Sequence, residues 1–172
     1  AGTYDILDNY LKKIHMSIIA KMQIGWIKPK ILLPAADRLP SGLKCYSLGN
    51  SEAQPVAVIL YHNGAPDEYF IIENKSKSGS PRNFNADLPS EGLAIWWFNT
   101  STGALRLIDA SLIARNSGLN PMEYGTPSND ALFKFKEGDN PRVPIILRNQ
   151  NGQTIFTLRA VSPVGKIMQV EL

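Results

Sequence analysis

The chain has 172 residues, 44% of them apolar and 19% charged, which is long enough for one globular domain with its own core. Its net charge is only +3 at pH 7 and its basic residues are scattered, which argues against a nucleic-acid partner. With two distant histidines, His15 and His62, and the single cysteine Cys45, the chain holds no His-Glu-x-x-His zinc helix, cysteine zinc knuckle or internal disulfide.

The first predicted element is an amphipathic helix over residues 8–25. Apolar residues recur there at intervals of three or four, which places them on one face: Leu11, Ile14, Ile18 and Met22. Asp8 or Asn9 is the expected N-cap, and Gly25 is expected at the C-terminal cap. We assign residues 1–30 to an N-terminal helical segment that packs on the β-domain or on a missing catalytic part. His15 lies at the edge of the apolar stripe, and without a second ligand at helical spacing we expect it to have a structural or surface role.

After Pro29 the pattern changes to short runs rich in β-branched and aromatic residues, bounded by glycine, proline, asparagine or serine. The predicted strands span residues 43–48, 55–62, 68–74, 92–99, 104–109, 131–136, 142–148, 153–161 and 166–172. In the last two, apolar and polar residues alternate, which predicts one face on a core and one in water. The pair Asn151-Gly152 is typical of a hairpin turn.

These elements predict a mainly β fold, namely an antiparallel β-sandwich or bent sheet with one N-terminal amphipathic helix. The β-domain is expected to span residues 31–172. Two long polar connections, residues 74–91 and 111–130, interrupt it, and loops of this length are usually functional or mobile. No apolar run approaches the roughly 20 residues of a membrane helix, so we expect no membrane span.

Nucleophilic catalysis has little support in the sequence. Cys45 lies in an apolar strand pattern with no histidine close by, which favours a buried inert thiol. The chain has no Gly-x-Ser-x-Gly motif and no phosphate-binding loop. We therefore predict no catalytic residue and no cofactor-binding residue in this chain.

Two carboxylates are candidate calcium ligands. Glu73 lies at the end of a predicted strand, and Asp87 lies in the loop that follows it. Calcium takes six to eight oxygen ligands, and these two side chains could converge on one ion. Ordinary solvated or hydrogen-bonded carboxylates are the competing interpretation, and the chain has no Asp-x-Asp-x-Asp-Gly loop to decide between the two.

Trp96 and Trp97 are adjacent in a predicted strand, so their side chains point to opposite faces. We expect one indole in the core and the other, Trp97, to emerge on the second face. An exposed Trp97 could stack on a sugar ring or pack against another domain. It is the candidate binding surface of this chain.

Several stretches, in the same order along the chain, resemble the immune inhibitor A family of secreted bacterial zinc metallopeptidases. The strongest similarity is in Glu68-Tyr-Phe-Ile-Ile-Glu-Asn74 and Asp87-Leu-Pro-Ser-Glu-Gly-Leu-Ala-Ile-Trp96, which look like the family's "EYF-LIENR" and "D-LPG-GLLIWH" segments. Residues 15–29 look like the segment that follows the family's active site. Residues 4–8, Tyr-Asp-Ile-Leu-Asp, look like its Met-turn. Asp130 with Phe133 and residues 162–168 look like its closing strands.

The chain also departs from this family. Leu7 takes the place of the Met-turn methionine, Trp97 replaces the usual histidine, and Lys75 stands where arginine is common. The resemblance implies that the zinc-binding helix, with its catalytic Glu, would lie before Ala1. We therefore expect zinc only in that upstream part, and no hydrolysis by this chain alone. The chain would be a fragment of such a peptidase or a divergent relative that lost the chemistry.

Two functions follow as expectations. In the first, the chain is the non-catalytic C-terminal portion of a secreted or cell-surface bacterial metallopeptidase-like protein. Residues 3–29 would then support the active-site floor and perhaps help to seat substrate, with the upstream catalytic domain as partner. In the second, it is a β-sandwich binding or adhesion module that recognises carbohydrate or a surface protein. A peptide or glycan is the expected ligand in either case.

Overall fold

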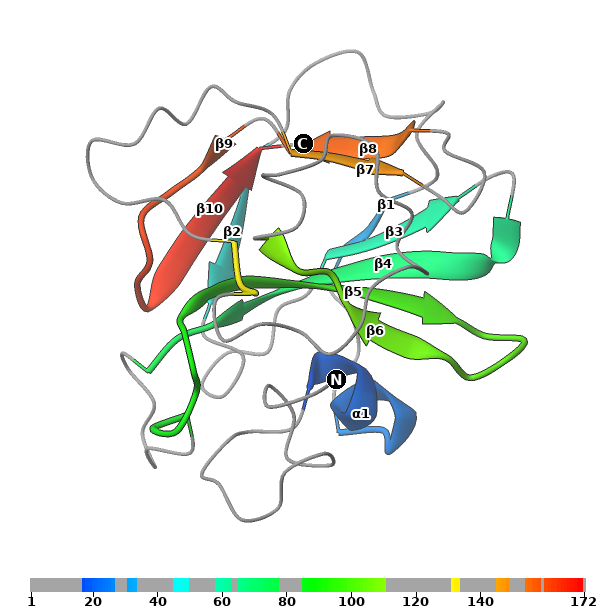
Figure 1. The fold of residues 1–172 in the computed structure, drawn as a ribbon, viewed down its shortest axis with the longest axis horizontal. Coiled ribbons are helices and arrows are strands. Elements are labelled where there is room, and N and C mark those ends of the chain that lie inside the picture. The colour runs from blue at the N-terminus through cyan, green and yellow to red at the C-terminus, as the bar shows by residue number, and fades with distance from the viewer. Residues whose placement is uncertain are drawn as a thin grey trace.

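The computed structural model describes residues 17–26, 31–33, 45–49, 58–62, 65–77, 85–110, 131–133, 145–148, 154–158 and 160–171. Within these ranges the protein is mainly β with a single short helix, which confirms the predicted fold class (Figure 1). The largest sheet has the order β1 (Ile31–Leu33), β3 (Val58–His62), β4 (Ala65–Lys75), β5 (Gly92–Asn99) and β6 (Leu105–Leu107).

Two smaller sheets complete the described strands. The first has the order β2 (Cys45–Gly49), β10 (Ile167–Glu171) and β9 (Ala160–Val161), and the second pairs β7 (Ile145–Arg148) with β8 (Thr154–Leu158). All described pairings are antiparallel except one, because β1 pairs in parallel with β3. The sequence pattern did not predict β1.

The centre of the fold is the long pair of β4 and β5. Their antiparallel register runs from Glu68 opposite Asn99 to Lys75 opposite Gly92. Every residue of β5 is buried. Its sequence, Gly-Leu-Ala-Ile-Trp-Trp-Phe-Asn, is almost continuously apolar, as expected for a strand covered on both faces. This double coverage determines the environment of every side chain discussed below.

Helix α1 (Ile18–Gln23) begins at the N-cap Ser17, whose hydroxyl accepts a hydrogen bond from the backbone N–H of Ala20. Its C-cap is Ile24, and Gly25, predicted at the C-terminal cap, follows directly with φ of 76°. The Gly25 N–H donates to the Met22 carbonyl and the Trp26 N–H to the Lys21 carbonyl, the two bonds of a Schellman motif.

The predicted continuous helix over 8–25 is wrong at Ser17, which has the non-helical angles φ −58° and ψ 154°. The apolar spacing continues across this serine, so the pattern alone predicts an unbroken helix. Its hydroxyl satisfies a backbone N–H that has no partner inside the helix, so the helix of the described residues starts there. The predicted caps Asp8 and Asn9 lie outside the described residues.

The predicted strand 153–161 divides between two sheets. Its first part, β8, pairs with β7, and its last two residues, β9, pair with β10. The pairing of β7 with β8 agrees with the hairpin predicted from Asn151-Gly152, although the turn itself lies outside the described residues. In β10, Met168 and Val170 are buried and Gln169 is exposed, which confirms the predicted alternation.

In Figure 1, α1 lies on one side of the five-stranded sheet and the three-stranded sheet lies on the other. Contacts from β4 and β5 support this layering, since Ile71 and Trp96 pack with α1 while Asn74, on the opposite face, bonds to β2. Among the described residues no helix has the length and apolar character needed to cross a bilayer.

Candidate functional site

The candidate site is the strand pair β4–β5, which carries the strongest part of the sequence resemblance. Side chains alternate between its two faces. The helix-facing side holds Ile71, Glu73 and Lys75 of β4 together with Trp96 of β5, and the register places them next to one another. The opposite side holds Glu68 and Asn74 of β4 and Trp97 of β5. Each face therefore combines an indole with a carboxylate.

On the helix-facing side, Trp96 donates its indole N–H to Oε1 of Glu73 over 2.7 Å. The Lys75 ammonium nitrogen lies 3.8 Å from the same oxygen and 5.9 Å from the centre of the Trp96 ring. The side chains of Glu73 and Lys75 are both fully buried. Removing either partner of such a buried ion pair would leave an uncompensated charge in the interior and destabilise the fold.

On the opposite side, Trp97 donates its indole N–H to Oε2 of Glu68 over 3.2 Å. Trp97 is 0% exposed, so the expectation that it emerges at the surface is wrong. The two indoles do point to opposite faces, as predicted, but both faces are covered. A ligand in solution could not reach Trp97 in this structure.

Asn74 connects the two sheets. Its side-chain amide nitrogen lies 3.1 Å from the carbonyl oxygen of Leu48 in β2 and 3.0 Å from that of Gly165, before β10. A third carbonyl, that of Lys166, lies at 3.4 Å. Asn74 is fully buried. Its amide N–H groups therefore donate to the carbonyl oxygens that water would otherwise satisfy at this junction.

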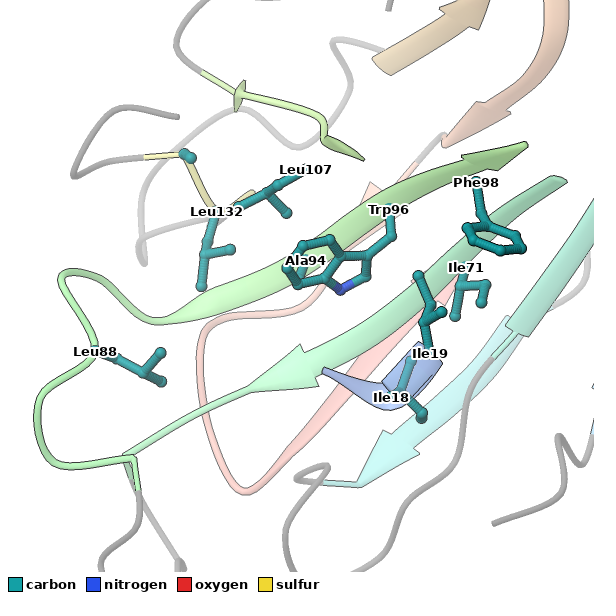
Figure 2. Packing of buried hydrophobic residues seen from close by; sticks show 10 residues of the cluster. Ile18, Ile19, Ile71, Leu88, Ala94, Trp96, Phe98, Leu107 and Leu132 are labelled. Carbon is teal, nitrogen blue, oxygen red and sulfur yellow. The ribbon is translucent and has the colours of Figure 1, made fainter. Parts of the chain in front are cut away.

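Helix α1 is held on the sheet by two isoleucines. Ile18 and Ile19 are 0% and 1% exposed, and they belong to one apolar cluster with Ile71, Trp96 and Phe98. Figure 2 shows this cluster, with both isoleucines on the side of the sheet from which the Trp96 indole projects. Burying an isoleucine side chain stabilises a fold by about 1.5–3 kcal/mol, so the two residues anchor a helix of only six.

The calcium candidates occupy different environments. Glu73 is buried against Trp96 and Lys75, whereas Asp87 is exposed within the turn that begins at Asn85. In the part of the chain that the structure describes, no three His, Cys, Asp or Glu side chains are grouped to hold a metal ion. Calcium binding by Glu73 and Asp87 remains a prediction.

Hydrogen bonds connect residues near the two ends of the predicted loop 74–91. Ser76 donates its hydroxyl to Glu91 over 3.2 Å, and the Lys77 N–H donates to the same carboxylate oxygen. The buried Asn85 donates from its amide nitrogen to the Ser76 carbonyl over 3.2 Å. The other predicted loop, residues 111–130, and His15 lie outside the described residues, as do the side chains of Cys45 and His62.

Sequence reasoning missed Lys75, Asn74 and Glu68 as interacting residues. The pattern that could have indicated Lys75 is its spacing from Glu73, because residues two apart share a strand face. Opposite charges at positions 73 and 75 share that face with the apolar Ile71, so the spacing indicates that the two side chains could pair. Nothing local in the sequence indicates that Asn74 would meet β2, since that contact depends on how the sheets pack.

Chemically, this arrangement positions groups and leaves none of them open to substrate. The Glu73 carboxylate is fully buried, and its contacts are an indole N–H and an ammonium group. Such a group is suited to holding Trp96 and Lys75 in place under the helix.

Compared with known proteins, the chain matches no family model, no curated protein and no solved structure.

Proposed function

We propose that this chain is the non-catalytic C-terminal portion of a secreted, bacterial zinc metallopeptidase-like protein. Its role would be to hold the segment that passes under the active site. The zinc and the groups that activate water would belong to the upstream catalytic domain. This chain would supply the floor on which that domain rests and would contribute to seating a peptide substrate.

The observation that carries the proposal is the docking of α1 on the β4–β5 pair. The helix belongs to residues 15–29, which resemble the segment following the family's active site. The sheet contains Glu68–Asn74 and Gly92–Trp96, which belong to the strongest part of the resemblance. These stretches are far apart in sequence, yet Ile18 and Ile19 are buried in one cluster with Ile71 and Trp96. A scaffold that positions an active-site floor requires this kind of long-range contact.

The buried charges give that contact a defined geometry. Trp96 packs in the cluster with α1, and its indole N–H is fixed by Glu73. A hydrogen bond to a charged acceptor contributes about 1.5–3 kcal/mol, which restricts the indole to one orientation. An apolar side chain of similar size would leave the surface beneath the helix less strictly defined.

The test begins with the native gene. The sequence upstream of the Ala1 codon should encode a His-Glu-x-x-His helix in the same reading frame. The full polypeptide should then hydrolyse a casein substrate, and the 172-residue chain alone, supplied with zinc, should not. In the full polypeptide, Ile19→Asp should lower kcat/KM by roughly 10²-fold, because displacing a supporting element by about 1 Å has effects of that size.

Ile24→Asp is the matched control, because Ile24 is 50% exposed just after the same helix. It should retain nearly full activity. An upstream region without the zinc motif would refute the proposal for the whole protein. Equal activity of the Ile19→Asp and Ile24→Asp polypeptides would refute the floor-supporting role of α1.

A binding or adhesion module is the second candidate, and the exposure of Trp26 favours it. This indole is 67% exposed just after α1, beside the half-exposed Ile24. Exposed aromatic rings can stack on sugars, and exposed apolar groups often mark interaction sites. A glycan array should then show binding that is lost in Trp26→Ala and retained in Ile167→Ala, where an exposed apolar residue is removed elsewhere. Identical arrays for wild type and Trp26→Ala would exclude this candidate.

A further inference from the structure

The ion pair on the helix-facing side lacks a direct hydrogen bond between its two charged groups. Glu73 and Lys75 are two residues apart on one strand, and neither side chain is exposed to solvent. The ammonium nitrogen lies 3.8 Å from Oε1, which is beyond hydrogen-bonding distance. That oxygen already accepts the Trp96 indole N–H at 2.7 Å. The charges therefore attract each other without a direct hydrogen bond between them.

The second carboxylate oxygen is more informative. Oε2 of Glu73 is buried, and within the described residues it accepts no hydrogen bond. A buried charged acceptor left without a partner is more costly than a neutral polar group in the same position. More than nine-tenths of buried polar groups in proteins have a protein or water partner. A donor for Oε2 is therefore expected, and the fold must supply it or admit it.

We propose that one internal water molecule binds between Glu73 and Lys75, donating a hydrogen bond to Oε2 and accepting one from the Lys75 ammonium. A polar contact longer than 3.5 Å is the usual setting for such a bridge. The ammonium has three N–H donors, so a bond to water is compatible with its other contacts.

Water fits this position better than an ion does. A metal cation at Oε2 would be repelled by the adjacent ammonium, and an anion at Nζ would be repelled by the carboxylate. A neutral molecule that both donates and accepts complements the two charges together. Buried waters typically make two to four such bonds to groups that the protein leaves unsatisfied. This inference concerns the interior of the chain and is independent of the proposed function.

A crystal structure of the 172-residue chain at atomic resolution tests the proposal. We expect an electron-density peak at hydrogen-bonding distance from both Glu73 Oε2 and Lys75 Nζ. A direct bond between Nζ and Oε2 with no density between them would overturn the proposal. So would a protein donor on Oε2.

The double variant Glu73→Gln, Lys75→Met checks that the pair holds the water. It removes both charges together and nearly preserves side-chain volume, so neither charge is left buried alone. The peak should be lost in its crystal structure, and a water that persists there with unchanged occupancy would overturn the assignment. If the double variant does not fold, the wild-type electron density decides alone.

Discussion

Oε1 of Glu73 accepts a 2.7 Å hydrogen bond from the indole of Trp96, a residue that lies diagonally across the strand pair and not directly opposite. Ile71 is opposite Trp96, so the indole reaches two residues along β4 to find the carboxylate. Trp97 does the same in the other direction, towards Glu68. Two adjacent tryptophans are thus fixed by carboxylates at separate points of one neighbouring strand.

Trp96→Phe should lower the free energy of unfolding by about 3 kcal/mol. The change removes the indole N–H, so the fully buried Glu73 carboxylate loses that hydrogen bond. The smaller ring also leaves unfilled volume in the core. Urea denaturation followed by far-ultraviolet circular dichroism measures this without relying on tryptophan emission. Trp97→Phe is the matched control, with the same loss of volume but a longer bond of 3.2 Å to a carboxylate on a residue that is 6% exposed.

We expect the control to lose about 1 kcal/mol less than Trp96→Phe, since its hydrogen bond is longer and the Glu68 residue is not fully buried. Equal losses in both variants would indicate that ring volume alone determines the effect. The special role given to the Glu73 contact would then be incorrect.

Ile19→Ala should cost about 2–4 kcal/mol of stability, because Ile19 is 1% exposed in the cluster that joins α1 to the sheet. Hydrogen exchange should show selective loss of protection in α1 before β4 and β5, since the short helix has little stability of its own. Ile24→Ala, at a residue 50% exposed, should change stability by less than about 0.5 kcal/mol. Uniform loss of protection over helix and sheet would contradict this ordering.

The strands could be predicted from sequence where composition and turns agree. The predicted ranges 92–99 and 68–74 correspond closely to β5 and β4, because both are rich in β-branched and aromatic residues and are bounded by loop residues. The three-residue β1 was missed, since so short a run has no readable period. The division of 153–161 between two sheets was missed because local pattern does not indicate which partner a strand will meet.

The environment of individual side chains was harder to predict. Alternation correctly places Trp96 and Trp97 on opposite faces, yet the exposure of Trp97 depends on whether a second layer covers its face. The three-stranded sheet lies on that side, and the bond from Asn74 to β2 is a tertiary contact between segments distant in sequence. Glu73 was predicted to be a metal ligand at the edge of a loop because its tertiary surroundings cannot be inferred from local sequence. Sequence alone does not show that Glu73 is buried against Trp96 and Lys75.

Asn74→Asp should destabilise the junction of the two sheets by about 3 kcal/mol or more. The substitution keeps the shape of the side chain but places a carboxylate oxygen against the carbonyl oxygens of Leu48 and Gly165. Thermal unfolding should move to lower temperature. Hydrogen exchange should become faster in β2 and β10 than in β5. Gln169→Glu, an equivalent amide-to-acid change at an exposed position of β10, is the control and should be nearly neutral.

Gly92→Ala should be the most disruptive single-methyl change in the described chain. Gly92 has φ of +148°, which L-residues rarely adopt, and an added Cβ would overlap the Phe133 carbonyl oxygen and lie 3.0 Å from its carbon. The Phe133 backbone cannot retreat without breaking its two hydrogen bonds to Leu93, of 2.8 and 2.9 Å. The backbone strain alone is of order 1–3 kcal/mol, and the overlap adds to it.

Gly103→Ala separates these two contributions. Gly103 also has positive φ, +69°, but an added Cβ there would have no atom within 4 Å. Its cost should therefore be only the conformational part, about 1 kcal/mol. Urea denaturation should thus show Gly92→Ala to be several-fold more destabilising than Gly103→Ala. Nuclear magnetic resonance should show the Leu93 and Phe133 amides losing exchange protection in the first variant alone. Similar costs in both would mean that backbone conformation, and not the close approach of Phe133 to β5, requires glycine at position 92.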